Sequence, residues 1–146
     1  MVLNYSRVVG KGRGMFREID HLAIVVKDTE EALAFYRDVL KLEVLLSEVL
    51  DGPGVRLTHL DMGNVKLQLV EPMTEGHPLK AHLEERGEGL HHVCWKVGDI
   101  DEAMDGLGAF GLKAKAGEPH AAPRGGRAAF IEPTQTRGVL WEMTGE

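Results

Sequence analysis

One pattern occurs twice in this chain, and this duplication limits the possible fold more than any other feature of the sequence. Residues 19–32 (IDHLAIVVKDTEEA) align without a gap with residues 90–103 (LHHVCWKVGDIDEA). The alignment places His21 on His92, which follows it by 71 residues. A repeat of this length predicts a duplicated supersecondary unit whose two copies bury a joint core.

Each copy has the sequence pattern of a strand, a helix and three further strands. The first copy begins with a short run of apolar and β-branched residues, which predicts a strand. Asp28 follows, with acidic residues in the next turn, and predicts the N-cap of an amphipathic helix. Turn sequences rich in glycine separate the later strands. The predicted elements are strands at 19–26, 42–50, 55–61 and 65–70, a helix at 28–40, and a stop at Glu71-Pro72.

The second copy repeats this order, with Asp99 as the helix N-cap. We therefore expect an α+β fold in a single domain, residues 18–146, made of two βαβββ modules at about 18–72 and 89–145. Residues 1–17 hold no acidic residue and no apolar block typical of a secretory signal, so we expect a flexible N-terminal extension, with a basic transit peptide as the alternative. The remaining predicted elements are strands at 90–97, 112–116, 127–131 and 138–144, and a connecting helix at 77–86.

Composition excludes several classes of partner. The chain has 17 Lys and Arg against 23 Asp and Glu, a net charge of −6 that argues against broad nucleic-acid binding. No apolar run approaches the roughly 20 residues that a membrane-spanning helix requires. Cys94 is the only cysteine, so the chain cannot form an internal disulfide, and we expect a buried structural thiol. We expect a cytoplasmic protein with no membrane partner.

Four residues at equivalent positions of the repeat suggest a metal site. Near the end of each copy, VKLQLVEP aligns with VLWEMTGE and places Gln68 on Glu142. If the two copies are related by a pseudo-twofold axis, these two residues can converge with His21 and His92. Two imidazoles, one carboxylate and one amide oxygen suit a divalent metal ion.

Each residue also has an ordinary interpretation. A strand histidine is often a surface or core residue, Gln68 fits the solvent face of an alternating strand, and Glu142 fits a polar strand position. Their joint placement favours the metal site. His91 competes with His92, and the alignment favours His92 because His91 falls on Asp20. Adjacent strand residues face opposite ways, so we expect only one of the two histidines in the site.

The chain resembles the methylmalonyl-CoA epimerase family of the vicinal-oxygen-chelate superfamily. The resemblance extends over about residues 19–143 and implies a curved mixed sheet of tandem βαβββ modules around a metal site. The Arg-Gly-Gly-Arg turn at 124–127 and the segment at 134–137 depart from the expected loops, which leaves the coenzyme A contacts unassigned. The resembling segments are DHLAIVVKDTEEALAFYRDVLKLEV, SEV at 47–49, KLQLVEP, HPLKAHLEERGEGLHHVCWKV with the following DID, and GVLWEM.

The resemblance implies the metal ligands His21, Gln68, His92 and Glu142, holding Co, Mn, Zn or Ni, and a homodimer. It also implies an acyl-CoA substrate, with the 2R and 2S forms of methylmalonyl-CoA interconverted by α-proton removal and return through an enolate. Glu48, in the Ser-Glu-Val stretch, matches the family's proposed catalytic carboxylate. Glu48 and Glu142 are then the candidates for proton transfer.

Several alternatives remain at this point. A fosfomycin-modifying transferase or an extradiol dioxygenase would also use two histidines and a glutamate, but Gln68 and Glu48 have no required role there. A glyoxalase I-type lactoylglutathione lyase uses related proton transfer at a metal, but usually has a carboxylate where Gln68 stands. A metal-free ligand-binding protein of the same superfamily would sequester its ligand without chemistry. Retention of all four implied ligands argues against this metal-free alternative.

Overall fold

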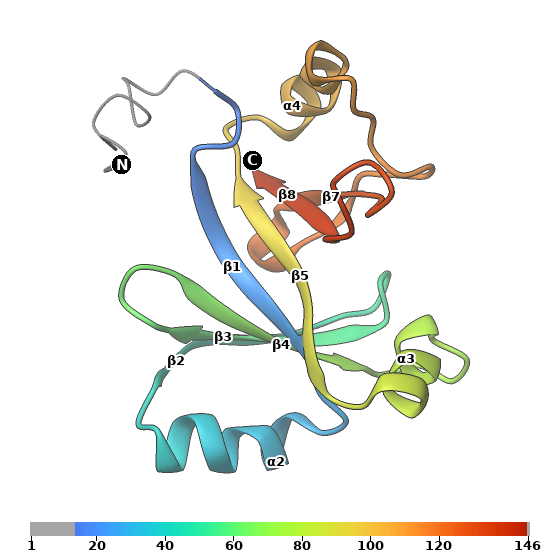
Figure 1. Ribbon diagram of the computed structural model, residues 1–146. Helices are drawn as coiled ribbons and strands as arrows, with labels where there is room; N and C mark the ends of the chain where they lie inside the picture. The colour runs from blue at the N-terminus through green and yellow to red at the C-terminus, as the bar shows by residue number, and fades with distance from the viewer. Residues whose placement is uncertain (1–13, 146) are drawn as a thin grey trace, which may run out of the picture.

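The computed structural model describes residues 14–145, which form one curved mixed β-sheet with helices packed against it (Figure 1). The strand order is β2-β3-β4-β1-β5-β8-β7-β6. The strands are β1 (Glu18–Val25), β2 (Glu43–Leu50), β3 (Val55–Asp61), β4 (Lys66–Pro72), β5 (Gly89–Lys96), β6 (His120–Ala121), β7 (Arg127–Ile131) and β8 (Trp141–Gly145). The α-helices are α2 (Thr29–Leu33), α3 (Pro78–Arg86) and α4 (Ile100–Gly106).

The sheet has a pseudo-twofold arrangement about the pair β1 and β5. These strands are antiparallel neighbours, and Figure 1 shows them side by side through the middle of the molecule. Each is also paired in parallel with the last strand of its own unit, β1 with β4 and β5 with β8. Ala23 pairs with Gln68, and Cys94 pairs with Glu142. Positions that the sequence alignment equates therefore make the same pairs in both units, and the predicted α+β fold of tandem βαβββ modules is confirmed.

The first helix of each unit begins at the predicted N-cap. The Asp28 side chain accepts a hydrogen bond from the Glu31 backbone N–H at 2.9 Å, and Asp99 accepts one from Glu102 at 2.8 Å. The helix predicted at 28–40 is present, but after α2 it continues as a π-helix, Ala34–Val39. After α4 a 3₁₀-helix, Leu107–Phe110, ends the second helical segment. The connecting helix predicted at 77–86 is α3, Pro78–Arg86.

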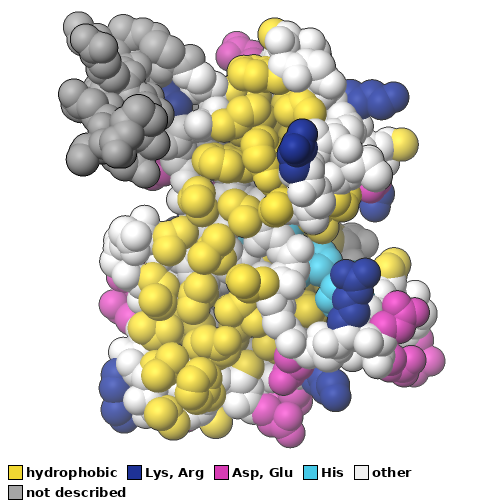
Figure 2. Space-filling view, in the orientation of Figure 1, with side chains coloured by type: hydrophobic (Ala, Val, Ile, Leu, Met, Phe, Trp, Pro, Cys, Tyr) yellow, Lys and Arg dark blue, Asp and Glu magenta, His cyan; other side chains and the backbone are white. Residues whose placement is uncertain are grey.

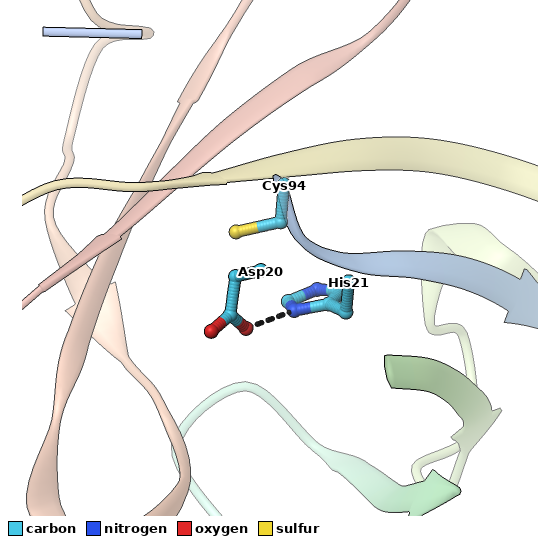
Figure 3. Close-up of side chains that lie close together, drawn as sticks. All are labelled: Asp20, His21 and Cys94. Atoms are coloured by element: carbon cyan, nitrogen blue, oxygen red, sulfur yellow. Dashed lines mark hydrogen bonds and ion pairs between the residues drawn. The ribbon is translucent and has the colours of Figure 1, made fainter. Parts of the chain in front are cut away.

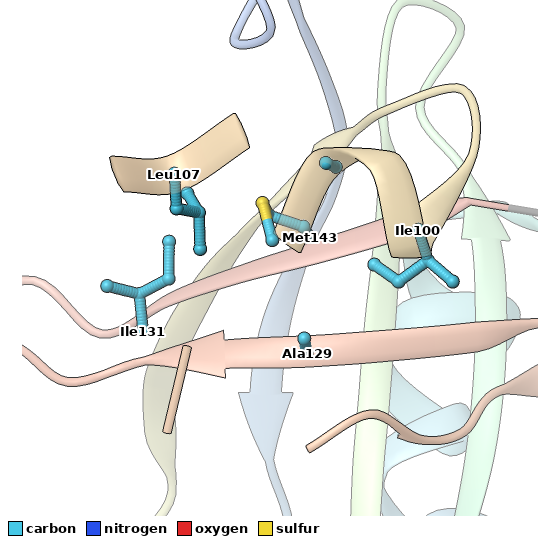
Figure 4. Close-up of a cluster of buried hydrophobic side chains, with 6 residues drawn as sticks. Ile100, Leu107, Ala129, Ile131 and Met143 are labelled. Carbon is cyan, nitrogen blue, oxygen red and sulfur yellow. The ribbon is translucent and has the colours of Figure 1, made fainter. Parts of the chain in front are cut away.

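The hydrophobic core lies between the sheet and the two helical segments. In the first unit Leu33 of α2 packs against Leu60 and Leu69 of the sheet. In the second unit Ile100 and Leu107 pack against the sheet residues Ala129, Ile131 and Met143 (Figure 4).

The predicted N-terminal extension lies mainly outside the described residues, since residues 1–13 are not among them. Within the remainder, Met15 and Phe16 pack against the core of the second unit. The Phe16 ring contacts Trp95 and Trp141 edge to face, with centroids 5.8 and 5.2 Å away.

One predicted strand is absent, and another ends later than predicted. Residues 112–116 form no strand, because β7 already has β8 on one side and the short strand β6 on the other. This segment contacts β7 through a hydrogen bond from the Lys115 N–H to the Phe130 carbonyl oxygen at 2.7 Å. The strand predicted at 65–70 is β4, which ends at Pro72, within the predicted stop; Pro72 still pairs with Val55, so the strand ends two residues later than predicted. Among the helices of residues 14–145, none is long and apolar enough to cross a membrane.

Candidate metal centre

Three of the four predicted ligands meet at one point of the sheet. His21 comes from β1, His92 from β5 and Glu142 from β8, and all three are buried. Oε1 of Glu142 lies 3.3 Å from Nε2 of His21 and 3.1 Å from Nε2 of His92. The three side chains can each direct one ligand atom at a common centre, with all three atoms within 4.8 Å of one another.

This geometry fits a divalent cation. Nitrogen and oxygen ligands bound about 2.1 Å from an ion lie about 3.0–3.4 Å apart when they are adjacent in its coordination shell. The distances from Glu142 to His21 and His92 fall in that range. In addition, Nε2 of His21 is buried and makes no hydrogen bond, although Oε1 of Glu142 is only 3.3 Å away. A buried imidazole nitrogen without a partner is unfavourable unless a ligand satisfies it.

Gln68 lies beside this group through His59. Gln68 is buried, and its Oε1 accepts a hydrogen bond from Nε2 of His59 at 2.7 Å. The His59 ring is in turn 5.7 Å from the His21 ring, centroid to centroid. An amide oxygen has two acceptor sites, so the second site of Oε1 remains for a cation. Burial lowers the pKa of His59, which keeps this imidazole neutral.

Both histidines of the His91-His92 pair line the cavity, contrary to the expectation that only one would enter the site. The cause is a β-bulge: Ala23 pairs with His92 but Ile24 pairs with Leu90, so His91 is an extra residue of β5. Nδ1 of His91 lies 2.8 Å from Nδ1 of His92, within hydrogen-bonding distance. Burial and the neighbouring His92 imidazole lower the pKa of His91 to about 4, so it is neutral at pH 7.

His120, on β6, holds the other oxygen of Glu142. Its Nε2 lies 2.9 Å from Oε2 of Glu142, and its Nδ1 lies 2.6 Å from Oε2 of Glu118. The His120 ring also stacks on Phe130, with centroids 5.0 Å apart. Glu142 thus has Oε1 directed at the two strand histidines and Oε2 at His120.

The electrostatics of this cluster favour an ionised Glu142. Burial alone raises the pKa of a carboxylate, but the nearby His92 and the contacts with His120 and His21 outweigh it and lower the pKa of Glu142 well below its usual range. Burial also opposes charge on His21, yet the contacts with Asp20 and Glu142 raise its pKa above 6.5. In the metal-free protein, the raised pKa values of His21 and His120 favour protonated imidazoles facing this carboxylate.

A second group of possible ligand atoms consists of Asp20, His21 and Cys94 (Figure 3). The Asp20 oxygens are already engaged, Oδ2 by Nδ1 of His21 at 2.7 Å and Oδ1 by Nζ of Lys66 at 3.0 Å. Burial raises the pKa of the Cys94 thiol well above its usual value, so the sulfur stays protonated. This group is therefore a poor metal site, and Cys94 is the buried thiol that the sequence indicated.

Glu48 lies apart from these residues. It is on β2, and its Oε2 accepts the backbone N–H of Arg124 at 3.0 Å. Its cross-strand neighbour Leu57 lines the cavity, whereas Glu48 does not. Glu48 thus lies beside the cavity wall, hydrogen-bonded to the Arg-Gly-Gly-Arg turn at 124–127. The other arginine, Arg127, pairs with Asp101 at 2.7 Å.

The cluster of His21, His92 and Glu142 lines a cavity of about 650 Å³. A cavity of this size accommodates a small-molecule ligand. Apolar side chains such as Leu57, Val70 and Leu140 form much of the wall, together with the basic residues Lys115 and Arg124. Figure 2 shows histidine side chains in the recess between the upper and lower halves of the visible face, beside a basic side chain.

Sequence reasoning missed several residues of this site. His59 was within reach, because a two-residue turn at Gly63-Asn64 fixes the β3–β4 register and places His59 opposite Gln68. His120 and Glu118 lie in and next to a two-residue strand between loops, where no periodic pattern marks them.

The comparisons with known proteins agree with the geometry. The model of the Glyoxalase/Bleomycin resistance protein/Dioxygenase superfamily matches residues 20–130. The chain belongs to this superfamily. It is 34% identical over 131 residues to the ethylmalonyl-CoA/methylmalonyl-CoA epimerase of Cereibacter sphaeroides, which covers 88% of this chain and 98% of that protein.

Two further relatives carry a similar name. The chain is 34% identical over 128 residues to the mitochondrial methylmalonyl-CoA epimerase of Mus musculus, covering 86% of this chain and 71% of that protein. A solved structure of a Streptomyces coelicolor methylmalonyl-CoA epimerase variant, in complex with 2-nitronate-propionyl-CoA, has a TM-score of 0.80 at 30% identity. That match covers 90% of this chain and 98% of the other. The resemblance to methylmalonyl-CoA epimerases predicted from the sequence motifs is confirmed.

Proposed function

We propose that this chain is a methylmalonyl-CoA epimerase that uses a divalent metal ion held by His21, Gln68, His92 and Glu142. The observation that carries the proposal is the convergence of two imidazole nitrogens and one carboxylate oxygen, all buried, at the wall of a ligand-sized cavity. The relatives named for this activity support the choice of reaction. The ethylmalonyl-CoA/methylmalonyl-CoA name of one relative supports a short branched acyl-CoA as the substrate class.

The reaction requires a proton to leave the carbon between a thioester and a carboxylate and to return on the opposite face. A bound divalent cation would supply Lewis-acid stabilisation of negative charge on the substrate oxygens. The protein itself supplies rigid ligands and a largely apolar wall that includes Leu57 and Val70. Exclusion of water from such a site strengthens each electrostatic contact made there.

We propose Glu48 and Glu142 as the carboxylates that move the proton. Glu142 is already in the cavity wall. Glu48 lies on β2 directly opposite Leu57, which lines the cavity, and its carboxylate accepts from the Arg124 backbone N–H. This contact engages Oε2 alone and orients the carboxylate, so Oε1 is the oxygen that we propose takes the proton.

The test is hydrogen exchange at the α-carbon of a methylmalonyl thioester in deuterated water. Protein stripped with a chelator and then reloaded with Co²⁺, Mn²⁺, Zn²⁺ or Ni²⁺ is compared with the stripped protein. Metal-dependent deuterium uptake and interconversion of the 2R and 2S forms support the proposal. If the metal-loaded forms bind the thioester but none of them catalyses deuterium uptake, the proposal is contradicted. Turnover of a glutathione hemithioacetal instead would indicate the glyoxalase I-type activity.

We also propose that the protein is a cytoplasmic homodimer. Large apolar side chains are exposed at Leu90 (73%), Val39 (65%) and Phe110 (52%), and Figure 2 shows hydrophobic side chains over much of one face. Exposed apolar area of this kind is typical of association surfaces. Sedimentation equilibrium of the full chain tests the dimer, and a monomer at micromolar concentration would contradict it.

A further inference from the structure

Asp20 occupies on β1 the place that His91 occupies on β5. On β1, Ile19 pairs with Trp95 of β5, and the next pair is His21 with Cys94. Asp20 has no partner in this register, so it is the extra residue of a β-bulge. The alignment of the two units places Asp20 on His91, the extra residue of the second bulge. A bulge redirects a side chain next to a site that would otherwise face away. Both units therefore have an equivalent bulge immediately before a proposed ligand histidine.

Each bulge residue contacts Nδ1 of the histidine that follows it. Oδ2 of Asp20 lies 2.7 Å from Nδ1 of His21, as the dashed line in Figure 3 marks. Because an ionised carboxylate only accepts hydrogen bonds, the proton of this bond is on His21. In the neutral imidazole, the form that binds a cation, Nε2 of His21 then has a lone pair on the side of Glu142, where it makes no hydrogen bond in the metal-free protein.

The same logic applies to His92. Its Nδ1 lies 2.8 Å from Nδ1 of His91, so one ring donates and the other accepts. In the metal-free protein Nε2 of His92 donates to Oε1 of Glu142, 3.1 Å away. If a cation takes the place of that proton, Nδ1 of His92 can donate to His91 and the Nε2 lone pair would face the cation. His91 then accepts at Nδ1 and carries its own proton at Nε2.

We propose that Asp20 and His91 are positioning residues that hold His21 and His92 in the ring orientation and tautomer that present Nε2 to a divalent cation. The inference rests on the proposed metal centre and adds the reason why both histidines face it in the same way. Outer partners of metal-bound histidines typically contribute 10–100-fold to metal affinity.

The two positions are not equal. Asp20 has a carboxylate, anchored by Nζ of Lys66 at 3.0 Å, whereas His91 has an imidazole ring. A hydrogen bond to a charged acceptor is roughly twice as strong as one between neutral groups. Loss of the Asp20 side chain should therefore weaken metal binding more than loss of His91.

The experiment measures Co²⁺ affinity of the full chain by competition with a chromophoric chelator. We expect Asp20→Ala to weaken binding by about 10–100-fold, and His91→Ala to weaken it by about 10-fold. Asp20→Asn keeps an acceptor oxygen and should recover part of the loss, which also covers the case of a poorly folded Asp20→Ala variant. Glu18→Gln, an exposed acid on the same strand, is the control and should bind as the wild type does. The double variant Asp20→Ala with Lys66→Met removes the lysine charge left unpaired, and the same loss is expected.

A spectroscopic readout separates positioning from a general loss of structure. In the Co²⁺-loaded protein, each metal-bound histidine with a hydrogen-bonded Nδ1 proton gives a hyperfine-shifted, exchangeable proton resonance. The wild type should show two such resonances, with one broadened or lost in Asp20→Ala and the other in His91→Ala. If the wild type binds no Co²⁺, the proposed metal centre fails. If the wild type binds Co²⁺, and Asp20→Ala and His91→Ala both show its affinity to within about threefold and both of its resonances, this inference fails while the metal centre stands.

Discussion

Met143 and Glu142 are neighbours on β8 with opposite roles, and substitution of Met143 tests this division. The Met143 side chain is fully buried and packs with Ile100, Leu107 and Ile131 beneath the second helical segment (Figure 4). Removal of a buried methionine to alanine costs about 2–5 kcal/mol in free energy of unfolding, as lost transfer energy plus the cavity left behind. In a chain of this size each 1 kcal/mol lowers Tm by about 3 °C, so Met143→Ala should lower Tm by about 6–15 °C.

The same variant should leave metal binding intact. Successive strand residues point to opposite faces of the sheet, so Met143 faces the helices while Glu142 faces the cavity. Below its Tm, Met143→Ala should bind Co²⁺ with an affinity within about threefold of the wild type. Glu142→Gln, which loses a charged ligand, should bind more weakly by over about 100-fold, because even loss of an outer partner costs 10–100-fold.

Thermal unfolding by circular dichroism of the metal-free proteins and chelator competition with Co²⁺ give the two quantities. A fall in Tm of less than about 3 °C for Met143→Ala would mean that this side chain is not part of a packed core. A loss of Co²⁺ affinity in Met143→Ala as large as in Glu142→Gln would refute the separation of the two faces of β8.

Three further predictions concern the site. Glu48→Gln should abolish deuterium uptake at the substrate α-carbon while the metal content measured by atomic absorption stays unchanged; the exposed Glu43→Gln on the same strand is the control, and uptake retained in Glu48→Gln removes Glu48 from the mechanism. The raised pKa of His21 means that its protonated form stabilises the metal-free protein fully below pH 6.5, and that this contribution is lost as the pH rises through the raised value. Since a cation must displace that proton, Co²⁺ affinity should fall and proton release should rise as the pH is lowered toward 6, and calorimetry in two buffers that found neither would contradict this. Cys94 should resist thiol reagents in the native protein and react after denaturation, because it is buried and its thiol pKa is raised; rapid labelling of the native protein would count against this burial.

The convergence of His21, His92 and Glu142 could be predicted from the sequence because the repeat encodes it. The strand and helix patterns of the two units, the N-caps Asp28 and Asp99, and the equivalence of Gln68 with Glu142 are local signals, and the pairing of β1 with β4 and β5 with β8 agrees with them. A duplicated unit that buries a joint core then brings equivalent strands together.

Two residues next to the proposed ligands, His91 and His120, could not be placed in the site from the sequence. A β-bulge shifts the alternation of a strand by one residue, so a simple period-two pattern excludes His91, although it lines the cavity. His120 reaches Glu142 from a two-residue strand whose position depends on how the preceding loop packs against β7. Such contacts are set by tertiary packing and leave no periodic signal in the sequence.

Anomalous diffraction from crystals of the Co²⁺-loaded protein tests the central claim most directly. The account predicts one strong cobalt peak about 2.0–2.2 Å from Nε2 of His21, Nε2 of His92 and a carboxylate oxygen of Glu142, with Oε1 of Gln68 as a further ligand. A peak between Asp20 and Cys94 instead, or a peak bound by only one of the two strand histidines, would contradict it.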